Sequence, residues 1–149
     1  MNKLLVILLL CCSLFACSYE PIFSNKKFNL KFTEISFKGD SKINKIIKDN
    51  LSEKGKGDKE FELYFFTEKN KDVVSSNAKG DPTIYKITID LDYFIKKSGE
   101  IIFEENISKN LTYNNIDDKF ELLKYEDNIV LNLSKNISDE ILMSVIALE

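Results

Sequence analysis

The sequence lacks most of the residue types on which enzyme active sites depend. Its 149 residues include no histidine, no tryptophan and no arginine, so every basic residue is a lysine. Without histidine the usual general base is absent, and neither a Ser-His nor a Cys-His pair can form. The sequence also contains no glycine-rich phosphate loop and no HExxH or paired-cysteine zinc motif. We therefore expect a protein that is not an enzyme, that uses no cofactor or metal, and that binds no nucleic acid.

Pairs of carboxylates are the remaining candidates for chemistry. Such pairs serve glycosidases and calcium sites. The sequence offers three of them: Asp90 and Asp92, Glu104 and Glu105, and Asp117 and Asp118. All three fall on predicted solvent faces of strands or at a helix cap, so we interpret them as surface groups. A membrane-tethered hydrolase is the alternative that a concave pocket with convergent carboxylates would favour.

The cysteines and the longest apolar run are confined to the N-terminus. Lys3 precedes an apolar stretch of about twelve residues that ends at Phe15, whereas a transmembrane helix needs roughly 20. Such a segment is typical of an export signal. Leu14-Phe15-Ala16-Cys17 resembles the lipobox of bacterial lipoproteins. We therefore expect residues 1–16 to be a signal peptide cleaved between Ala16 and Cys17. An ordinary secretory signal that ends near a cysteine is the alternative.

The lipobox resemblance implies both an anchor and a compartment. Cys17 would become the mature N-terminus and carry diacylglycerol and an amide-linked acyl chain such as palmitate. Each buried CH₂ contributes about 0.8 kcal/mol, so several chains hold a protein stably on a membrane. Ser18 rather than aspartate follows the cysteine, which in such lipoproteins implies the periplasm-facing side of the outer membrane.

The remaining chain suits a single domain with an uneven charge distribution. We expect residues 17–27 to form an acylated tether and residues 28–149 to form one α+β domain. Residues 24–59 hold ten lysines and five acids, whereas residues 60–149 hold ten lysines and 18 acids. The basic N-terminal part can mark a partner surface of opposite charge. A solvated, lysine-rich face is the alternative interpretation.

Two long strands joined by a tight turn dominate the pattern. On both sides of Lys97-Ser98-Gly99, apolar residues fall at alternate positions, as on one face of a pleated strand. They are Tyr85, Ile87, Ile89, Leu91, Tyr93 and Ile95 on the first arm and Ile101, Phe103, Ile107, Leu111 and Tyr113 on the second. Residues 28–38, with a bulge near Thr33-Glu34, and residues 60–67 are the other predicted strands. Residues 68–81 are polar and predict a loop or a short edge strand at Val73-Val74.

Helical spacing occurs in two segments. Ile43, Ile46, Ile47 and Leu51 predict a helix that begins after Gly39-Asp40-Ser41 and is ended by Gly55 and Gly57. A second helix of about 30 residues is expected after a cap at Asp117 or Asp118. Its predicted buried stripe consists of Phe120, Leu123, Val130, Leu133, Ile137, Ile141, Val145 and Leu148.

These elements predict an α+β fold with a four-stranded, mostly antiparallel sheet, a long hairpin, and both helices packed on one face. The other face of the sheet is then only partly protected. Ile84, Phe94 and Ile102 should lie on it, near the turn of the hairpin at a projecting end. Such an exposed apolar patch indicates a docking surface.

The chain resembles the LptE-like family of lipopolysaccharide-assembly lipoproteins. The resemblance covers nearly all of the sequence after Cys17 and rests on fold marks rather than on a catalytic signature. These marks are the strand–helix–strand order, the long final helix, and the residues Ser18-Tyr19-Glu20-Pro21-Ile22-Phe23, Gly80-Asp81-Pro82-Thr83, Tyr85, Gly99, Phe103 and Tyr113-Asn114.

This resemblance implies a non-enzymatic role in lipopolysaccharide transport. Such a protein is a plug inside an LptD-type β-barrel of the outer membrane, which it helps to fold. The uncovered face and the hairpin end would contact the barrel wall. We expect Lys42, Lys45 and Lys48 to meet the phosphates of the lipopolysaccharide. A different lipoprotein scaffold, such as a barrel-assembly or transporter accessory, is the alternative.

Overall fold

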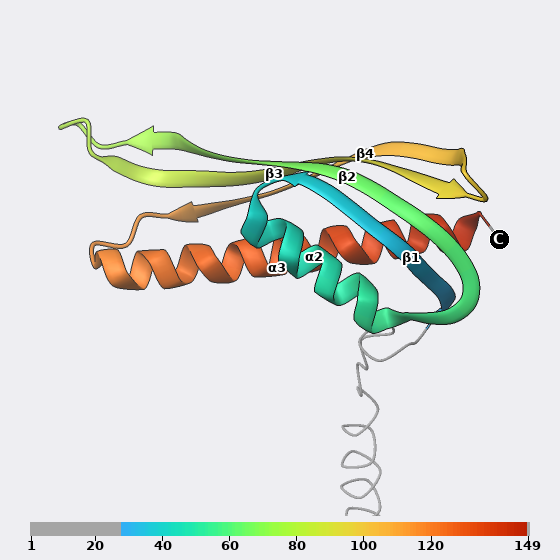
Figure 1. Cartoon of the computed structure of the whole chain (residues 1–149). Helices are drawn as coiled ribbons and strands as arrows, with labels where there is room; N and C mark the ends of the chain where they lie inside the picture. Colours follow the sequence, from blue (N-terminus) through green and yellow to red (C-terminus); the bar gives the residue numbers. More distant parts are fainter. Residues whose placement is uncertain (1–27, 149) are drawn as a thin grey trace, which may run out of the picture.

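The computed structural model describes residues 28–148 of the chain (Figure 1). The predicted signal peptide, the Ala16–Cys17 cleavage site and the tether lie outside the described residues. The described chain forms, in order, β1 (Phe28–Gly39), α2 (Ser41–Lys54), β2 (Gly55–Ser76), β3 (Pro82–Lys97), β4 (Glu100–Asn114) and α3 (Lys119–Ala147).

The strands form one four-stranded sheet in the order β1-β2-β3-β4. β1 and β2 are parallel, while the β2–β3 and β3–β4 pairs are antiparallel. A parallel pair needs a crossover connection, and α2 supplies it. Both helices cover the same face of the sheet (Figure 1). The predicted α+β architecture is therefore confirmed, including the long β3–β4 hairpin and its turn, where Gly99 adopts a φ of +85°.

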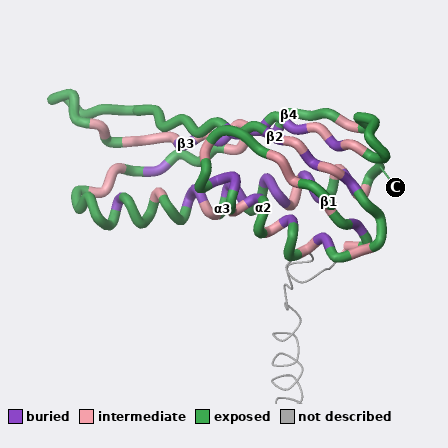
Figure 2. The backbone as a smooth tube through the Cα atoms, in the orientation of Figure 1, coloured by how far each residue is buried: buried purple, intermediate pink, exposed green. Residues whose placement is uncertain are grey.

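The hydrophobic core lies between the sheet and the two helices. Every second residue of β3 from Ile87 to Ile95 points into it, and α2 contributes Ile43, Ile47 and Leu51. Burial is concentrated where both helices and β1 are present, whereas the tip of the β2–β3 hairpin is exposed (Figure 2). The alternation predicted from the sequence thus identifies the buried face of β3 correctly.

The local details of β1 and α2 follow the sequence closely. The β1–β2 register shifts between Phe32 and Glu34, at the predicted bulge. Asp40 caps α2, because its carboxylate accepts hydrogen bonds from the backbone N–H groups of Lys42 and Ile43. Gly39 takes a φ of +100°, and a Cβ atom there would lie 1.9 Å from the carbonyl oxygen of Thr67. Only glycine fits this turn without displacing β2.

The predicted loop at residues 68–81 is wrong for most of its length. β2 continues to Ser76, and its polar second half pairs with β3 from Glu68↔Asp90 to Val73↔Tyr85. Both faces of this half are exposed, so its sequence shows no apolar alternation. Backbone pairing with β3 makes it a strand despite its composition. The projecting end of the sheet is therefore the β2–β3 hairpin and not the β3–β4 turn (Figure 1).

The predicted stripe of α3 is wrong in its first turns. Asp118 caps the helix as expected, but the side chains of Phe120 and Leu123 are 69% and 58% exposed. Leu122 and Ile129 are buried in their place. The helix contacts only the sheet at this end, while further along it also packs against α2. Its buried face therefore changes along its length, which a single stripe cannot represent.

A buried polar cluster fastens the start of α2 to the sheet. The Asn44 side chain is 1% exposed, and its amide donates to the carbonyl oxygen of Lys38 at 3.1 Å. The Thr67 hydroxyl donates to the Asn44 Oδ1 atom at 2.6 Å and accepts from the Asp40 backbone N–H at 3.2 Å. Asn44 thereby links β1, α2 and β2 through groups that water cannot reach.

We predict that Asn44→Ala lowers the free energy of unfolding by about 2 kcal/mol, because the Thr67 hydroxyl and the Lys38 carbonyl lose buried partners. Urea unfolding followed by circular dichroism measures the change. Asn128→Ala, at an exposed position of α3, is the matched control and should alter stability by less than about 0.5 kcal/mol. Equal effects of the two substitutions would contradict the role of the cluster.

Candidate functional site

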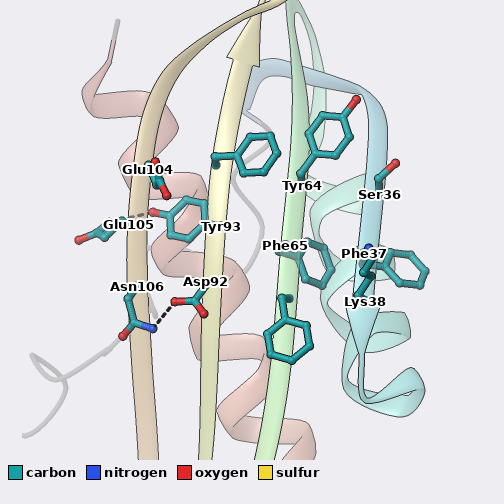
Figure 3. Close-up of a pocket in the computed structure, with 12 residues that line it drawn as sticks. Ser36, Phe37, Lys38, Tyr64, Phe65, Asp92, Tyr93, Glu104, Glu105 and Asn106 are labelled. Carbon is teal, nitrogen blue, oxygen red and sulfur yellow. Dashed lines mark hydrogen bonds between the residues drawn. The ribbon is translucent and has the colours of Figure 1, made fainter.

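The uncovered face of the sheet carries a groove of about 750 Å³. A row of residues crosses all four strands there, with Ser36 opposite Tyr64, Tyr64 opposite Phe94, and Phe94 opposite Glu104. Figure 3 shows this face, with the helices behind the sheet. The groove is lined by Ser36, Phe37, Lys38, Tyr64, Phe65, Phe66, Asp92, Tyr93, Phe94, Glu104, Glu105 and Asn106.

Stacked aromatic rings form the floor of the groove. The rings of Tyr64 and Phe94 lie 4.9 Å apart between centroids with an interplanar angle of 10°. The ammonium group of Lys96 sits 4.9 Å from the Tyr64 ring centroid and 5.6 Å from that of Phe94. Phe66 is exposed beside them. An aromatic surface of this kind, rimmed by charged groups, resembles the core of a protein–protein interface.

The groove has a negative electrostatic environment on the β1 and β2 side. Desolvation first, and then the carboxylates of Glu34 and Glu62, raise the pKa of the Tyr64 phenol above its ordinary value. The Tyr64 hydroxyl also donates a long hydrogen bond, 3.4 Å, to Glu62. The tyrosine therefore stays neutral at physiological pH and presents a ring with a polar tip.

Four of the candidate carboxylates each accept hydrogen bonds from a separate neighbouring group. Asp92 accepts from the Asn106 amide at 2.7 Å, and Asp90 accepts from the Ser108 hydroxyl at 2.6 Å. Glu105 accepts from the Tyr93 hydroxyl at 2.8 Å (Figure 3). Asp118 serves as the cap of α3. Within residues 28–148 no three acids or other ligating groups come together as a metal site, and neither helix is long and apolar enough to span a membrane.

The three apolar residues predicted for docking do not form one patch. Phe94 lies in the groove, and Ile102 is 39% exposed near the β3–β4 turn. Ile84 pairs with Asn114 at the opposite end of β3, roughly 33 Å from Phe94 at ~3.3 Å per residue. The prediction that all three lie near the turn is therefore wrong for Ile84, because β3 enters the sheet at the projecting β2–β3 end.

The three predicted lysines lie together on α2, and each contacts a neighbouring group. Lys42 forms an ion pair with Asp127 of α3 at 2.6 Å, and Lys45 pairs with Asp49 at 2.7 Å. The Lys48 ammonium lies 5.8 Å from the Phe37 ring centroid. The side chains of Lys42 and Lys45 are 54% and 77% exposed. They remain accessible to an anionic ligand.

Sequence reasoning missed the contribution of β2 and β1 to the groove. Tyr64 and Phe66 stand on the second face of a strand whose first face is already apolar. A strand with two apolar faces indicates a central position in the sheet but does not by itself indicate a binding site. The signal that points to a site is that both residues are aromatic and that no helix is available to cover them.

A second cluster anchors the projecting half of the sheet to α3. The Tyr113 hydroxyl donates to the Glu126 Oε1 atom at 2.7 Å, and Lys71 of β2 forms an ion pair with the same oxygen at 2.6 Å. The Lys71 ammonium also lies 4.2 Å from the Tyr85 ring centroid. β2 and β4 thus meet α3 at one carboxylate, and Tyr85 of β3 joins the cluster through Lys71.

Solved structures of several bacterial lipoproteins share this fold. Rare lipoprotein B from Shewanella oneidensis superposes with a TM-score of 0.60 at 12% identity, over 76% of this chain and 94% of that one. Uncharacterized lipoprotein B from Nitrosomonas europaea gives 0.59 at 12% identity, over 78% and 83%. A putative lipoprotein from Caulobacter crescentus gives 0.51 at 9% identity, over 74% and 85%. No protein-family model matches the chain, and no curated protein sequence matches it significantly. These similarities establish the fold.

We predict that stability falls as the pH rises above about 10. Desolvation raises the pKa of the Tyr93 and Tyr113 phenols above the ordinary value of 10. For Tyr113 the hydrogen bond to Glu126 raises the pKa further. The folded protein then keeps protons that the unfolded chain loses, so the stabilising contribution is complete below pH 10 and is lost above it. Urea unfolding between pH 8 and about 11 measures the decline. Tyr113→Phe should reduce the slope and cost about 1.5 kcal/mol at pH 7; an unchanged slope would contradict the assignment.

Proposed function

We propose that this chain is an outer-membrane lipoprotein, facing the periplasm, that acts as a non-enzymatic plug and assembly partner of an LptD-type β-barrel in lipopolysaccharide transport. The first support for the proposal is the resemblance of Leu14-Phe15-Ala16-Cys17 to a lipobox, in which Cys17 would carry the anchor. The described domain has a fold that is found in bacterial lipoproteins from three organisms. The proposal also draws on the resemblance of the sequence to the LptE-like family.

The observation that carries the proposal is the aromatic groove on the uncovered sheet face. Tyr64, Phe66 and Phe94 leave ring surface exposed where a monomer gains nothing from it. Aromatic anchors with a polar rim are the side chains that dominate protein–protein association. A rigid sheet presents them without a further ordering cost. We expect this surface to pack against the wall of the barrel.

The lysines of α2 are the proposed contact for the transported lipid. α2 packs on the face of the sheet opposite the groove and carries Lys42 and Lys45. The Lys48 ammonium, in contrast, reaches the ring of Phe37, which is one of the groove residues. A plug with two such surfaces would hold the barrel with one and meet the phosphates of lipopolysaccharide with the other. Each lysine would exchange an exposed intramolecular contact for a phosphate.

A different lipoprotein scaffold is the second candidate. The observation that favours it is that the structures sharing this fold are named only as lipoproteins, so the fold alone selects no partner. Detergent copurification of the acylated protein separates the two functions by the identity of the barrel or transporter that is recovered.

We predict that Phe94→Glu reduces copurification with the LptD-type barrel by at least about tenfold, because a carboxylate replaces a central aromatic anchor. Thr88→Glu, on the same face of β3 but outside the groove, is the matched control and should have little effect. Ile84→Glu tests the projecting end separately. All three variants should fractionate with membranes and keep the wild-type circular dichroism spectrum. Unchanged copurification of folded Phe94→Glu would refute the groove as the contact.

We predict that the triple variant Lys42→Glu/Lys45→Glu/Lys48→Glu loses most of its lipopolysaccharide binding, because three attractive charges become repulsive. The wild-type affinity should also fall as salt is raised. The matched control reverses Lys119, Lys124 and Lys135 on α3, which changes the net charge equally. Fluorescence polarisation with labelled lipopolysaccharide measures binding by the α2 variant and by the α3 control variant and distinguishes their effects. Full binding by the α2 variant would remove these lysines from the proposal.

A further inference from the structure

The outer edge of β4 is long, regular and uncovered. β4 is a terminal strand of the sheet, and no strand among residues 28–148 pairs with its outer side. Its register with β3 is unbroken from Ile84↔Asn114 to Ile95↔Phe103, and it contains no proline. Such an edge presents free N–H and C=O groups to another strand.

We propose that two copies of this chain pair through their β4 strands, antiparallel and with Ile107 on the two-fold axis. A symmetric pair of this kind must place one residue opposite itself, because side chains on the same face oppose one another. With Ile107 on the axis, Glu105 faces Lys109 of the second copy and Phe103 faces its Leu111. Symmetry produces each of these contacts twice.

Charge complementarity favours this register. Centres on Asn106 or Ser108 oppose no like charges, but only the Ile107 centre sets Glu105 against Lys109. A pair centred on Glu104, on Glu105 or on Lys109 would place identical charges directly opposite each other, which destabilises a sheet. Centring on Ile107 leaves no like charges opposed, and on the uncovered face it sets Asn106 against Ser108 and Glu104 against Asn110. On the helix side, the register centred on Ile107 gives both an opposite-charge pair, Glu105 with Lys109, and an apolar pair, Phe103 with Leu111.

The side chains involved are already positioned for the contact. Glu105 is held by the Tyr93 hydroxyl at 2.8 Å, and Lys109 is held by an ion pair with Glu140 of α3. Both charges are therefore fixed at the edge before association. Leu111 is 39% exposed and Phe103 is half-buried, so pairing them removes apolar surface from water.

The other free edges are less suited to self-association. β1 is interrupted by its bulge between Phe32 and Glu34, a feature that discourages edge-to-edge pairing. β2 is unpaired on its outer side beyond Thr67, where β1 ends. Symmetric pairing there, centred on Lys71 or Asp72, would oppose like charges. The edge of β4 thus combines an unbroken register with an opposite-charge pair, Glu105 with Lys109.

Register-specific disulfide formation tests the proposal on the full-length acylated protein in detergent. Glu104→Cys and Asn110→Cys would face each other across the pair, whereas within one chain they lie roughly 20 Å apart at ~3.3 Å per residue. Only an intermolecular bond can therefore form. Mild oxidation should give a dimer on a non-reducing gel. The control, Glu104→Cys with Thr112→Cys, shifts the register and should give about tenfold less.

The parent chain without added cysteines sets the background, and circular dichroism confirms that the variants fold. Sedimentation of the wild-type protein in detergent provides a reading that needs no substitution and should reveal a dimer of the chain. Equal cross-linking by the two double variants, no cross-linking by a folded variant, or a wild-type protein that remains monomeric at high concentration would each overturn the proposal. A product containing a different protein would do so as well, since it would show another occupant at this edge.

Discussion

One-sided packing is the constraint on which the rest of this structure depends. Two helices cover one face of a four-stranded sheet, and the remaining face is left to water. The buried side can therefore be uniformly apolar, as in β3, where Ile87, Ile89 and Leu91 alternate with polar residues. The open side must be polar enough for solubility, so each aromatic residue on it requires a separate explanation.

The groove shows how such residues are kept on an open face. Tyr64 and Phe94 stack on each other, and Lys96 lies over both rings. The ring surfaces are thus partly shielded by their own contacts and by the methylene stem of a lysine. A partner that displaces Lys96 would meet a flat, preformed aromatic floor. This arrangement keeps aromatic rings on the open face of the sheet at a small cost in stability.

The groove and the β4 edge are neighbouring but chemically different surfaces. The groove offers side chains to a partner, whereas the edge offers mainly backbone hydrogen-bonding groups, and in the proposed dimer Glu105 and Lys109 would set the register. Both include β4, since Glu104 and Asn106 line the groove. A barrel wall that also reached the β4 edge would compete with a second copy. Self-association would then cover the edge of the anchored domain until its partner is present.

The sequence by itself determined the elements whose local chemistry is decisive. Period-two alternation located β3 and β4, Asp40 and Asp118 marked both helix starts, and the slip between Phe32 and Glu34 marked the bulge. These features depend on neighbouring residues and on the choice between a buried and a solvated face. The class of fold followed from their order.

Only the tertiary structure decided the features that depend on distant partners. The polar second half of β2 is a strand because β3 lies beside it, and Phe120 is exposed because α2 does not reach the first turn of α3. Ile84 and Phe94 share a strand face but lie at opposite ends of the sheet. The groove exists because Ser36, Tyr64, Phe94 and Glu104 come from four strands that fall into one row. Strand register across a sheet is a property of the assembled fold, and no local pattern specifies it.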